Sequence, residues 1–180
     1  MPFTPLHMGP GILLKALLQG FFSLIIFGWS QILMDLQPLF AMITGMGSLH
    51  GFSHTYLGAT LIALISAFTG KWVYDLVMNF VKNDFTGYQK KLFDVPRELT
   101  ISVCIVSAFL GTCTHVVLDS IMHGDMEPFY PFNPDNNLHL LLSIETLYKF
   151  CIYTGVIGTV IFFAIRYLKL KAKTKVAGTD

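Results

Sequence analysis

Long apolar runs separated by short polar segments dominate the pattern of the chain. Four runs are long enough, or nearly so, to cross the hydrocarbon core of a membrane, which takes about 20 helical residues. These runs cover residues 21 to about 43, 56–68, 100–122 and 146–168. The second run is short by itself, and we expect it either to borrow residues 72–74 or to be buried among its neighbours. The pattern predicts an all-α fold, a polytopic membrane bundle of about four spans.

A shorter apolar piece precedes the first span. Residues 11–18 carry Lys15 in their middle, which favours a half-length or re-entrant helix over a further span, with Gly20 as the turn. No internal repeat or domain linker interrupts the sequence, so we expect residues 1–180 to form one membrane domain. Residues 83–97 are predicted to be a loop, with Gly87 and Pro96 as helix breakers.

Basic residues are distributed unequally between the connections. They concentrate in residues 70–99 and in the C-terminal segment RYLKLKAKTK, and two spans separate these regions, which places both on one face. The connections at about 44–55 and 123–145 contain no Lys or Arg. The positive-inside rule then predicts the orientation of an integral membrane protein, with both basic regions at the cytoplasmic face. Residues 83–97 and the basic tail, 169–180, are expected in the cytoplasm with the C-terminus.

Composition agrees with this class and excludes others. The chain is 53% hydrophobic and 13% charged, and its mean hydropathy of +0.60 is typical of membrane proteins. A net charge of +1 without a basic patch gives no support for nucleic-acid binding. The three cysteines lie scattered within apolar runs, which argues against a disulfide framework. The first residues lack a basic segment and a small-residue cleavage site, so they do not resemble a removable signal peptide.

Ionisable residues interrupt one of the most apolar parts of the chain, THVVLDSIMHGD at residues 114–125. His115, Asp119 and His123 are spaced by four, which predicts a stripe on one helix face that ends at the outward side. An ionised Asp in lipid costs several kcal/mol, so a chain retains it only when it is paired, hydrated or bound to a cation. These residues are therefore functional candidates.

Further ionisable residues are expected at the same depth. HGFSHT contains His50 and His54, again spaced by four if the helix of the second span begins near residue 49. Asp35 and His7 lie on either side of the Gly20 turn at similar separations, so a helical hairpin would bring them level. Pro38 is expected to end or bend the helix just beyond Asp35. The candidate metal ligands are thus His7, Asp35, His50, His54, His115, Asp119 and His123.

Imidazole and carboxylate groups at helical spacing suit zinc or a similar divalent transition metal. Seven candidate ligands exceed what one zinc ion needs, which allows one or two ions. Asp125 and Glu127, in HGDMEPFYPF, are candidates for a catalytic general base, for partners of the ligands, or for a solvated loop. The alternative without a functional role is that these His and Asp residues pair for structural reasons and bind no metal. Ser53 beside His54 invites a Ser-His-Asp interpretation, but the G-x-S-x-G elbow is not present.

The order of these motifs resembles the YdjM-like family of inner-membrane, LexA-regulated metal-dependent hydrolases. The resemblance extends over about two thirds of the chain and rests on T-P-L-H ending at His7, M-D-L-Q at Asp35, HGFSHT at His50 and His54, and H-V-V-L-D at His115 and Asp119. The chain departs from the family pattern at Gln37, which replaces a second Asp, and at the spacing of His50. It also has His123 and Asp125 in place of a Thr and Gly region. The resemblance implies a membrane-embedded hydrolase, with His123 or Asp125 filling a vacated ligand position.

Together these observations favour a membrane-embedded metal-dependent hydrolase. A metal-activated water at the outward face would act on a membrane lipid or lipid-linked ester or phosphoester. The main alternative is a non-enzymatic metal-binding or cation- or proton-translocating membrane protein, which would place polar groups along the full depth of the bilayer.

Overall fold

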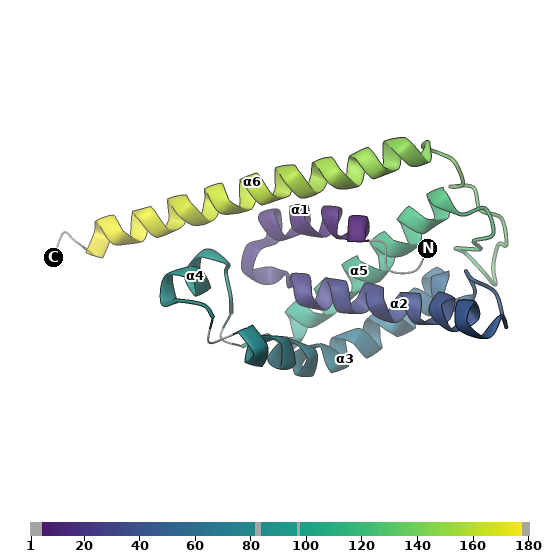
Figure 1. Ribbon diagram of the computed structural model, residues 1–180, viewed down its shortest axis with the longest axis horizontal. Helices are drawn as coiled ribbons and strands as arrows, with labels where there is room; N and C mark the ends of the chain where they lie inside the picture. The colour runs from purple at the N-terminus through teal and green to yellow at the C-terminus, as the bar shows by residue number, and fades with distance from the viewer. Residues whose placement is uncertain (1–4, 82–83, 97, 178–180) are drawn as a thin grey trace.

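The computed structural model describes residues 5–81, 84–96 and 98–177, and over these residues the chain is helical without a strand. Four helices are long and apolar enough to cross a membrane, and a shorter helix precedes them (Figure 1). The four are α2 (Leu24–Thr44), α3 (Tyr56–Val81), α5 (Ile101–Met122) and α6 (Ile144–Ala177). The predicted all-α bundle of about four spans is confirmed.

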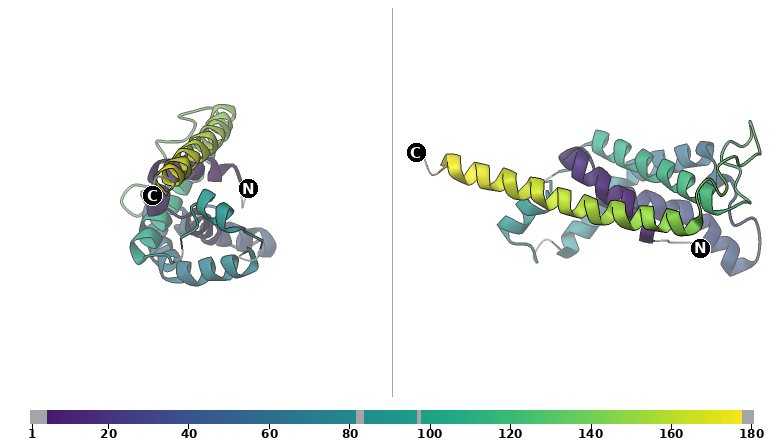
Figure 2. Two further views of the ribbon diagram at one scale, coloured as in Figure 1. Left: turned by 90° about the vertical axis from the view of Figure 1, so that its left-hand side faces the viewer. Right: turned by 90° about the horizontal axis from the view of Figure 1, so that it is seen from above.

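The N-terminal segment forms the expected half-length helix. A single 3-10 turn, η1 (Pro5–His7), continues into the 11-residue helix α1 (Met8–Leu18), which is about 16 Å long. The chain reverses through η2 (Gln19–Phe21), where Gly20 lies. Helix α1 packs along α6 (Figures 1 and 2). The approach is so close that a Cβ at Gly9 would lie 1.9 Å from the Cys151 carbonyl oxygen, which only glycine avoids.

Small residues allow α2, α3 and α5 to pack as a tight unit. Ala63 and Ala67 of α3 share a buried cluster with Ile26 of α2 and with Cys104 and Ala108 of α5. Lipid is as apolar as these side chains, so helices in a membrane associate by close packing rather than by hydrophobic burial. This three-helix unit provides a rigid support for the polar residues at one of its ends.

Helix α2 does not end at Pro38. It continues to Thr44, where Gly45 takes up the left-handed conformation at φ 69° and stops it. Proline has no N–H, so the carbonyl of Met34, four residues earlier, loses its helical donor. The Ser53 hydroxyl donates to this carbonyl oxygen at 3.3 Å. The helix can therefore contain Pro38 because another segment supplies the missing hydrogen bond.

Residues 83–97, expected to be a loop, contain the short helix α4 (Gly87–Leu92). Its first turn is closed by a capping box, in which Thr86 and Gln89 bond each other's backbone N–H groups. Helix α6 also runs through the expected basic tail as far as Ala177. Helix α4 lies at one end of the bundle, and the connections α2–α3 and α5–α6 lie at the other (Figure 1).

Candidate metal centre

Helix α5 supplies the middle of the centre. His115 and Asp119 lie one turn apart on its buried face, and His115 Nε2 is 3.2 Å from Asp119 Oδ2. Asp35 of α2 approaches from the neighbouring helix, with its Oδ1 3.5 Å from the same His115 nitrogen. The i, i+4 spacing predicted for His115 and Asp119 therefore holds, and the packing of α2 on α5 adds a second carboxylate.

Two further histidines approach from outside the spanning helices. His7, at the end of η1, places its Nε2 3.6 Å from Asp119 Oδ1. His54, at the end of the 3-10 turn η3 (Phe52–His54), places its Nε2 3.5 Å from Asp119 Oδ2. The His115 ring lies between these two rings, with centroid separations of 5.1 and 5.2 Å. Segments η1, η3 and α5 thus meet at Asp119, and α2 joins them through His115.

All five side chains are buried, with exposed fractions between 1% and 6%. Their imidazoles are nevertheless poorly satisfied. Among the residues that the structure describes, neither ring nitrogen of His7 or His115 has a hydrogen-bond partner, and neither has Nε2 of His54. Each such buried group costs about 1–3 kcal/mol. A cation that joins the nitrogens to the carboxylates would remove this cost.

The second nitrogen of His54 identifies its tautomer. Nδ1 lies 2.8 Å from Ser53 Oγ, and Oγ lies 3.3 Å from the Met34 carbonyl oxygen, which can only accept. Both hydrogen bonds form together only when Oγ donates to Met34 and Nδ1–H donates to Oγ. Nε2 then carries a lone pair directed at the Asp119 carboxylate, which is the form that binds metals.

Burial also keeps the histidines outside the spanning helices neutral. It lowers the pKa of His54 to about 4, with His115 acting in the same direction and Asp119 opposing. Burial likewise lowers the pKa of His7 to about 4 against the attraction of Asp119. Both imidazoles are thus neutral near pH 7, as metal coordination requires.

The distances fit a transition-metal site. Zinc binds nitrogen and oxygen ligands at about 2.0–2.2 Å in a tetrahedron, so neighbouring ligand atoms are about 3.3 Å apart. The four nitrogen–oxygen distances of 3.2, 3.5, 3.5 and 3.6 Å lie close to this value. Two overlapping ligand groups share His115, the first with His7 and Asp119 and the second with Asp35 and His54. Zinc and related divalent ions match this mixture of imidazole and carboxylate.

The remaining sequence candidates form a second group beside the first. His50 Nδ1 lies 3.0 and 2.9 Å from the two carboxylate oxygens of Asp125. The His50 ring stacks on His123 with centroids 4.2 Å apart, and it contacts His54 edge-on at 5.4 Å. His50, His123 and Asp125 also have ligand atoms close enough to hold an ion together. Hydrogen bonding to His50 keeps the pKa of Asp125 below its usual value, although partial burial opposes this.

Two helical expectations for these residues are wrong. Helix α3 begins at Tyr56, so His50 and His54 are not one turn apart on it; His50 lies in an irregular turn and His54 in η3. Helix α5 ends at Met122, and His123 takes an extended conformation at φ −120° and ψ 118°. The stripe of α5 therefore stops at Asp119, and His123 joins His50 instead of continuing it.

A cavity of about 350 Å³ connects the two groups. Asp35 and Asp119 line it on one side, and His50, His123 and Asp125 on the other. Pro38, Met42 and Leu49 complete its wall with apolar surface. Glu127 is not among these residues: it is exposed and lines a neighbouring cavity of about 220 Å³ together with His50 and Asp125.

The sequence drew attention to Ser53 and Gln37 but did not indicate that they support the centre. Ser53 orients His54, and the Gln37 side-chain oxygen accepts a hydrogen bond from the Ser53 backbone N–H at 2.9 Å. Their position beside His54 and Asp35 was the only available signal. No family model, curated protein or solved structure matches the chain.

Proposed function

We propose that this chain is a membrane-embedded, metal-dependent hydrolase. The observation that supports it most strongly is the convergence of five buried His and Asp side chains. Apart from Nδ1 of His54, which bonds Ser53, their ring nitrogens have no other partner among the described residues. The proposal agrees with the resemblance to the YdjM-like family in the order of the same motifs. His7, Asp35, His54, His115 and Asp119 would hold the metal, with zinc as the preferred ion. A second ion would use His50 and His123.

When bound, such an ion lowers the pKa of a coordinated water toward neutrality and polarises a carbonyl or phosphoryl oxygen. The chain contributes the remaining functions. Ser53 fixes the ring of His54, and Asp119 and Asp35 supply the negative charge that retains a cation. Asp125, held by His50, borders the cavity and would accept a proton there. Glu127 borders the adjoining cavity and is the second candidate for this role.

A lipid or lipid-linked ester or phosphoester is the proposed substrate class. One wall of the 350 Å³ cavity is apolar, formed by Pro38, Met42 and Leu49. The adjacent end of α2 and the turn after it expose large apolar side chains, including Ile43 and Met46 at 75% and 62%. A surface of this kind at the end of membrane-spanning helices suits a site that receives an amphiphile from the surrounding leaflet. By the positive-inside rule, this end faces outward from the inner membrane, with the C-terminus in the cytoplasm.

Cation or proton translocation is the second candidate. It is favoured by the buried polar residues of α2 that precede Asp35. Gln31 is one turn from Asp35, and its side-chain nitrogen has no hydrogen-bond partner among the described residues. Ser30 is also buried, but its hydroxyl donates to the Phe27 carbonyl of its own helix. Such a hydrogen bond returns to the backbone of the same helix and does not connect one side chain to the next along a translocation path. The hydrolase therefore ranks first.

Metal content tests the proposal directly. Full-length protein purified in detergent should carry stoichiometric metal by elemental analysis, and a His115→Ala, Asp119→Ala double variant should lose it. A His139→Ala, Asp135→Ala variant is the matched control, because both residues are exposed. The wild-type protein should then hydrolyse lipid ester or phosphoester substrates when zinc or manganese is added. Metal-free wild-type protein that is unaffected by added zinc would contradict the proposal, whereas metal without hydrolysis would favour the second candidate.

A further inference from the structure

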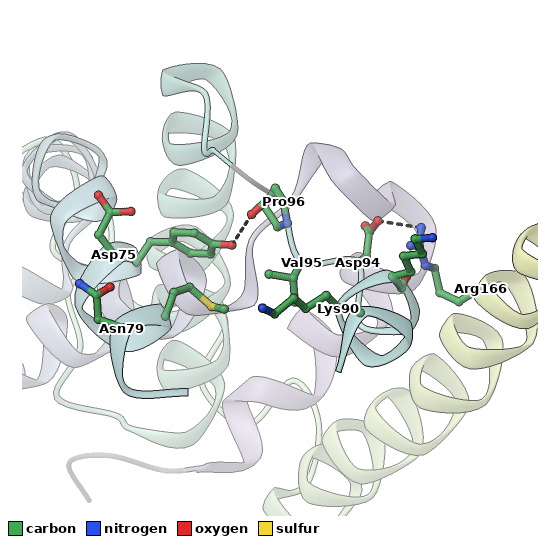
Figure 3. A pocket seen from close by; sticks show the side chains of 11 residues that line it. Asp75, Asn79, Lys90, Asp94, Val95, Pro96 and Arg166 are labelled. Carbon is green, nitrogen blue, oxygen red and sulfur yellow. Dashed lines mark hydrogen bonds and ion pairs between the residues drawn. The ribbon is translucent and has the colours of Figure 1, made fainter. Parts of the chain in front are cut away.

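A large cavity lies at the end of the bundle opposite the metal centre. Its volume is about 800 Å³, and it is bordered by the C-terminal half of α3, by α4 with the chain that follows it, and by α6 (Figure 3). Asp75 and Asn79 of α3 form one wall, and Asp94 and Arg166 form the opposite wall. Lys90 extends from α4 between the two walls. The residues proposed for hydrolysis lie at the other end.

An incompletely neutralised ion cluster forms one side of this cavity. Asp94 Oδ1 lies 2.7 Å from Arg166 Nη1, and Oδ2 lies 3.1 Å from Lys15 Nζ. Both carboxylate oxygens are thus engaged, yet one negative charge faces two positive charges. Arg166 also donates to the Lys91 carbonyl oxygen, while its buried Nε has no hydrogen-bond partner in the described part of the chain. The cluster therefore keeps an excess of positive charge.

Helix α4 increases this excess. Lys90 and Lys91 both line the cavity, and neither ammonium group forms an ion pair with a residue that the structure describes. Counting Lys15 behind Asp94, four cationic side chains are gathered against the carboxylates of Asp75 and Asp94. Lysine and arginine groups arranged in this way attract phosphate, which accepts several charge-assisted hydrogen bonds.

An apolar crevice adjoins the basic cavity. Its volume is about 130 Å³, it shares Tyr74, Met78 and Val95 with the larger cavity, and its own walls include Phe22 and Leu99. The crevice lies between the start of α2, the C-terminal half of α3 and the chain that follows α4, where one apolar helix begins and another ends. In a membrane these ends lie near the lipid headgroups, whose phosphates are then level with the lysines of α4.

We propose that the cavity bounded by Lys90, Lys91 and Arg166 binds the phosphate group of an anionic ligand. Two sources share this chemistry: the headgroup of a phospholipid in the adjacent leaflet, and soluble phosphate or a soluble phosphate ester. The site is separate from the proposed hydrolase centre and does not depend on metal there.

Binding to full-length protein tests the proposal in two arms. In one arm, the protein in phosphatidylcholine nanodiscs is titrated with phosphatidylglycerol; in the other, detergent-solubilised protein is dialysed against radiolabelled inorganic phosphate. A Lys90→Gln, Lys91→Gln variant should bind about tenfold more weakly in the arm that contains the true source. The Lys169→Gln, Lys171→Gln variant removes the same charge from exposed positions of α6 and should stay within about twofold of wild type. Asp75→Asn, which removes a carboxylate from the far wall, should tighten binding.

Each outcome decides the proposal. Selective loss of phosphatidylglycerol binding supports a lipid headgroup, and selective loss of inorganic phosphate binding supports a soluble ligand. Equal weakening by the two double variants would overturn the proposal, because the effect would then come from diffuse basic charge. Binding that is unchanged in both arms would overturn it as well.

Discussion

The Asp119→Asn substitution separates a metal centre from a structural network of ion pairs. The variant keeps the size of the side chain and removes its charge. Asp119 and Asp35 each contact Nε2 of His115, at 3.2 and 3.5 Å, so their contacting oxygens are at most about 6.7 Å apart. With an effective dielectric constant of about 20, two carboxylates at this separation repel each other by at least about 2.5 kcal/mol.

The two explanations predict opposite signs for the metal-free protein. If the carboxylates exist to bind a cation, metal-free protein contains this repulsion, and Asp119→Asn should leave its stability unchanged or raise it by about 2.5 kcal/mol. If the carboxylates instead neutralise a protonated His115, the substitution breaks a buried pair and should cost about 3–5 kcal/mol. Asp135→Asn, at an exposed position, is the control and should have no effect.

Added metal should reverse the order of stability of the wild-type protein and the Asp119→Asn variant. Zinc at about 100 times its dissociation constant stabilises a folded protein by about 2.7 kcal/mol, which raises Tm by roughly 5–11 °C for a chain of this size. The wild-type protein should show this shift and the variant should not. Thermal unfolding is measured by the fluorescence of Trp29 and Trp72 after chelation and again after zinc is restored. A Tm that does not respond to zinc in wild-type protein, together with a destabilised metal-free variant, would refute the reasoning.

Three further substitutions test separate parts of the structure. Ser53→Ala removes the acceptor that orients His54 and should weaken zinc binding about 10–100-fold in a chelator competition, whereas Ser48→Ala, at an exposed position, should not. Gly9→Ala places a methyl group 1.9 Å from the Cys151 carbonyl oxygen and should lower the free energy of unfolding by about 1–3 kcal/mol. Its control is Gly87→Ala, where the added methyl group has no atom within 4 Å. Equal Tm values for the two variants would contradict the close packing of α1 on α6. Asp94→Asn keeps a residue type that tolerates the positive φ of 55°. The substitution leaves Lys15 and Arg166 without their counter-charge, so thermal unfolding should show that the free energy of unfolding falls by about 3 kcal/mol. Asp84→Asn, at an exposed position, is the control and should not lower it.

Hydropathy was sufficient to predict the bundle because membrane spans leave a long, one-dimensional signal. The start of α3 at residue 56 and the end of α5 at residue 122 coincide with the bounds of the apolar runs 56–68 and 100–122, whereas the histidine spacing had extended both helices further. The short helix α4 was not predicted, although Thr86 and Gln89 carry the spacing of a capping box. A six-residue helix contributes little periodicity, so its capping residues were the only local evidence for it.

The second histidine group was harder to predict because periodicity gives no information about where a helix ends. His123 follows His115 and Asp119 at helical spacing, yet α5 ends at Met122, one residue before it. The extended backbone at His123 then directs the His123 ring toward His50. His50 and His54 have the same spacing in an irregular segment. Spacing by four is thus evidence for a shared face only within a helix whose bounds are known.

Pro38 connects the irregular part of the fold to the chemistry of the centre. By lacking an N–H, it frees the carbonyl of Met34, and the Ser53 hydroxyl uses that carbonyl as its acceptor. Because the hydroxyl proton is committed to Met34, Ser53 accepts from Nδ1 of His54 and leaves Nε2 available toward Asp119. A residue that sequence rules treat as a helix breaker therefore determines which nitrogen of a distant histidine faces the candidate metal centre.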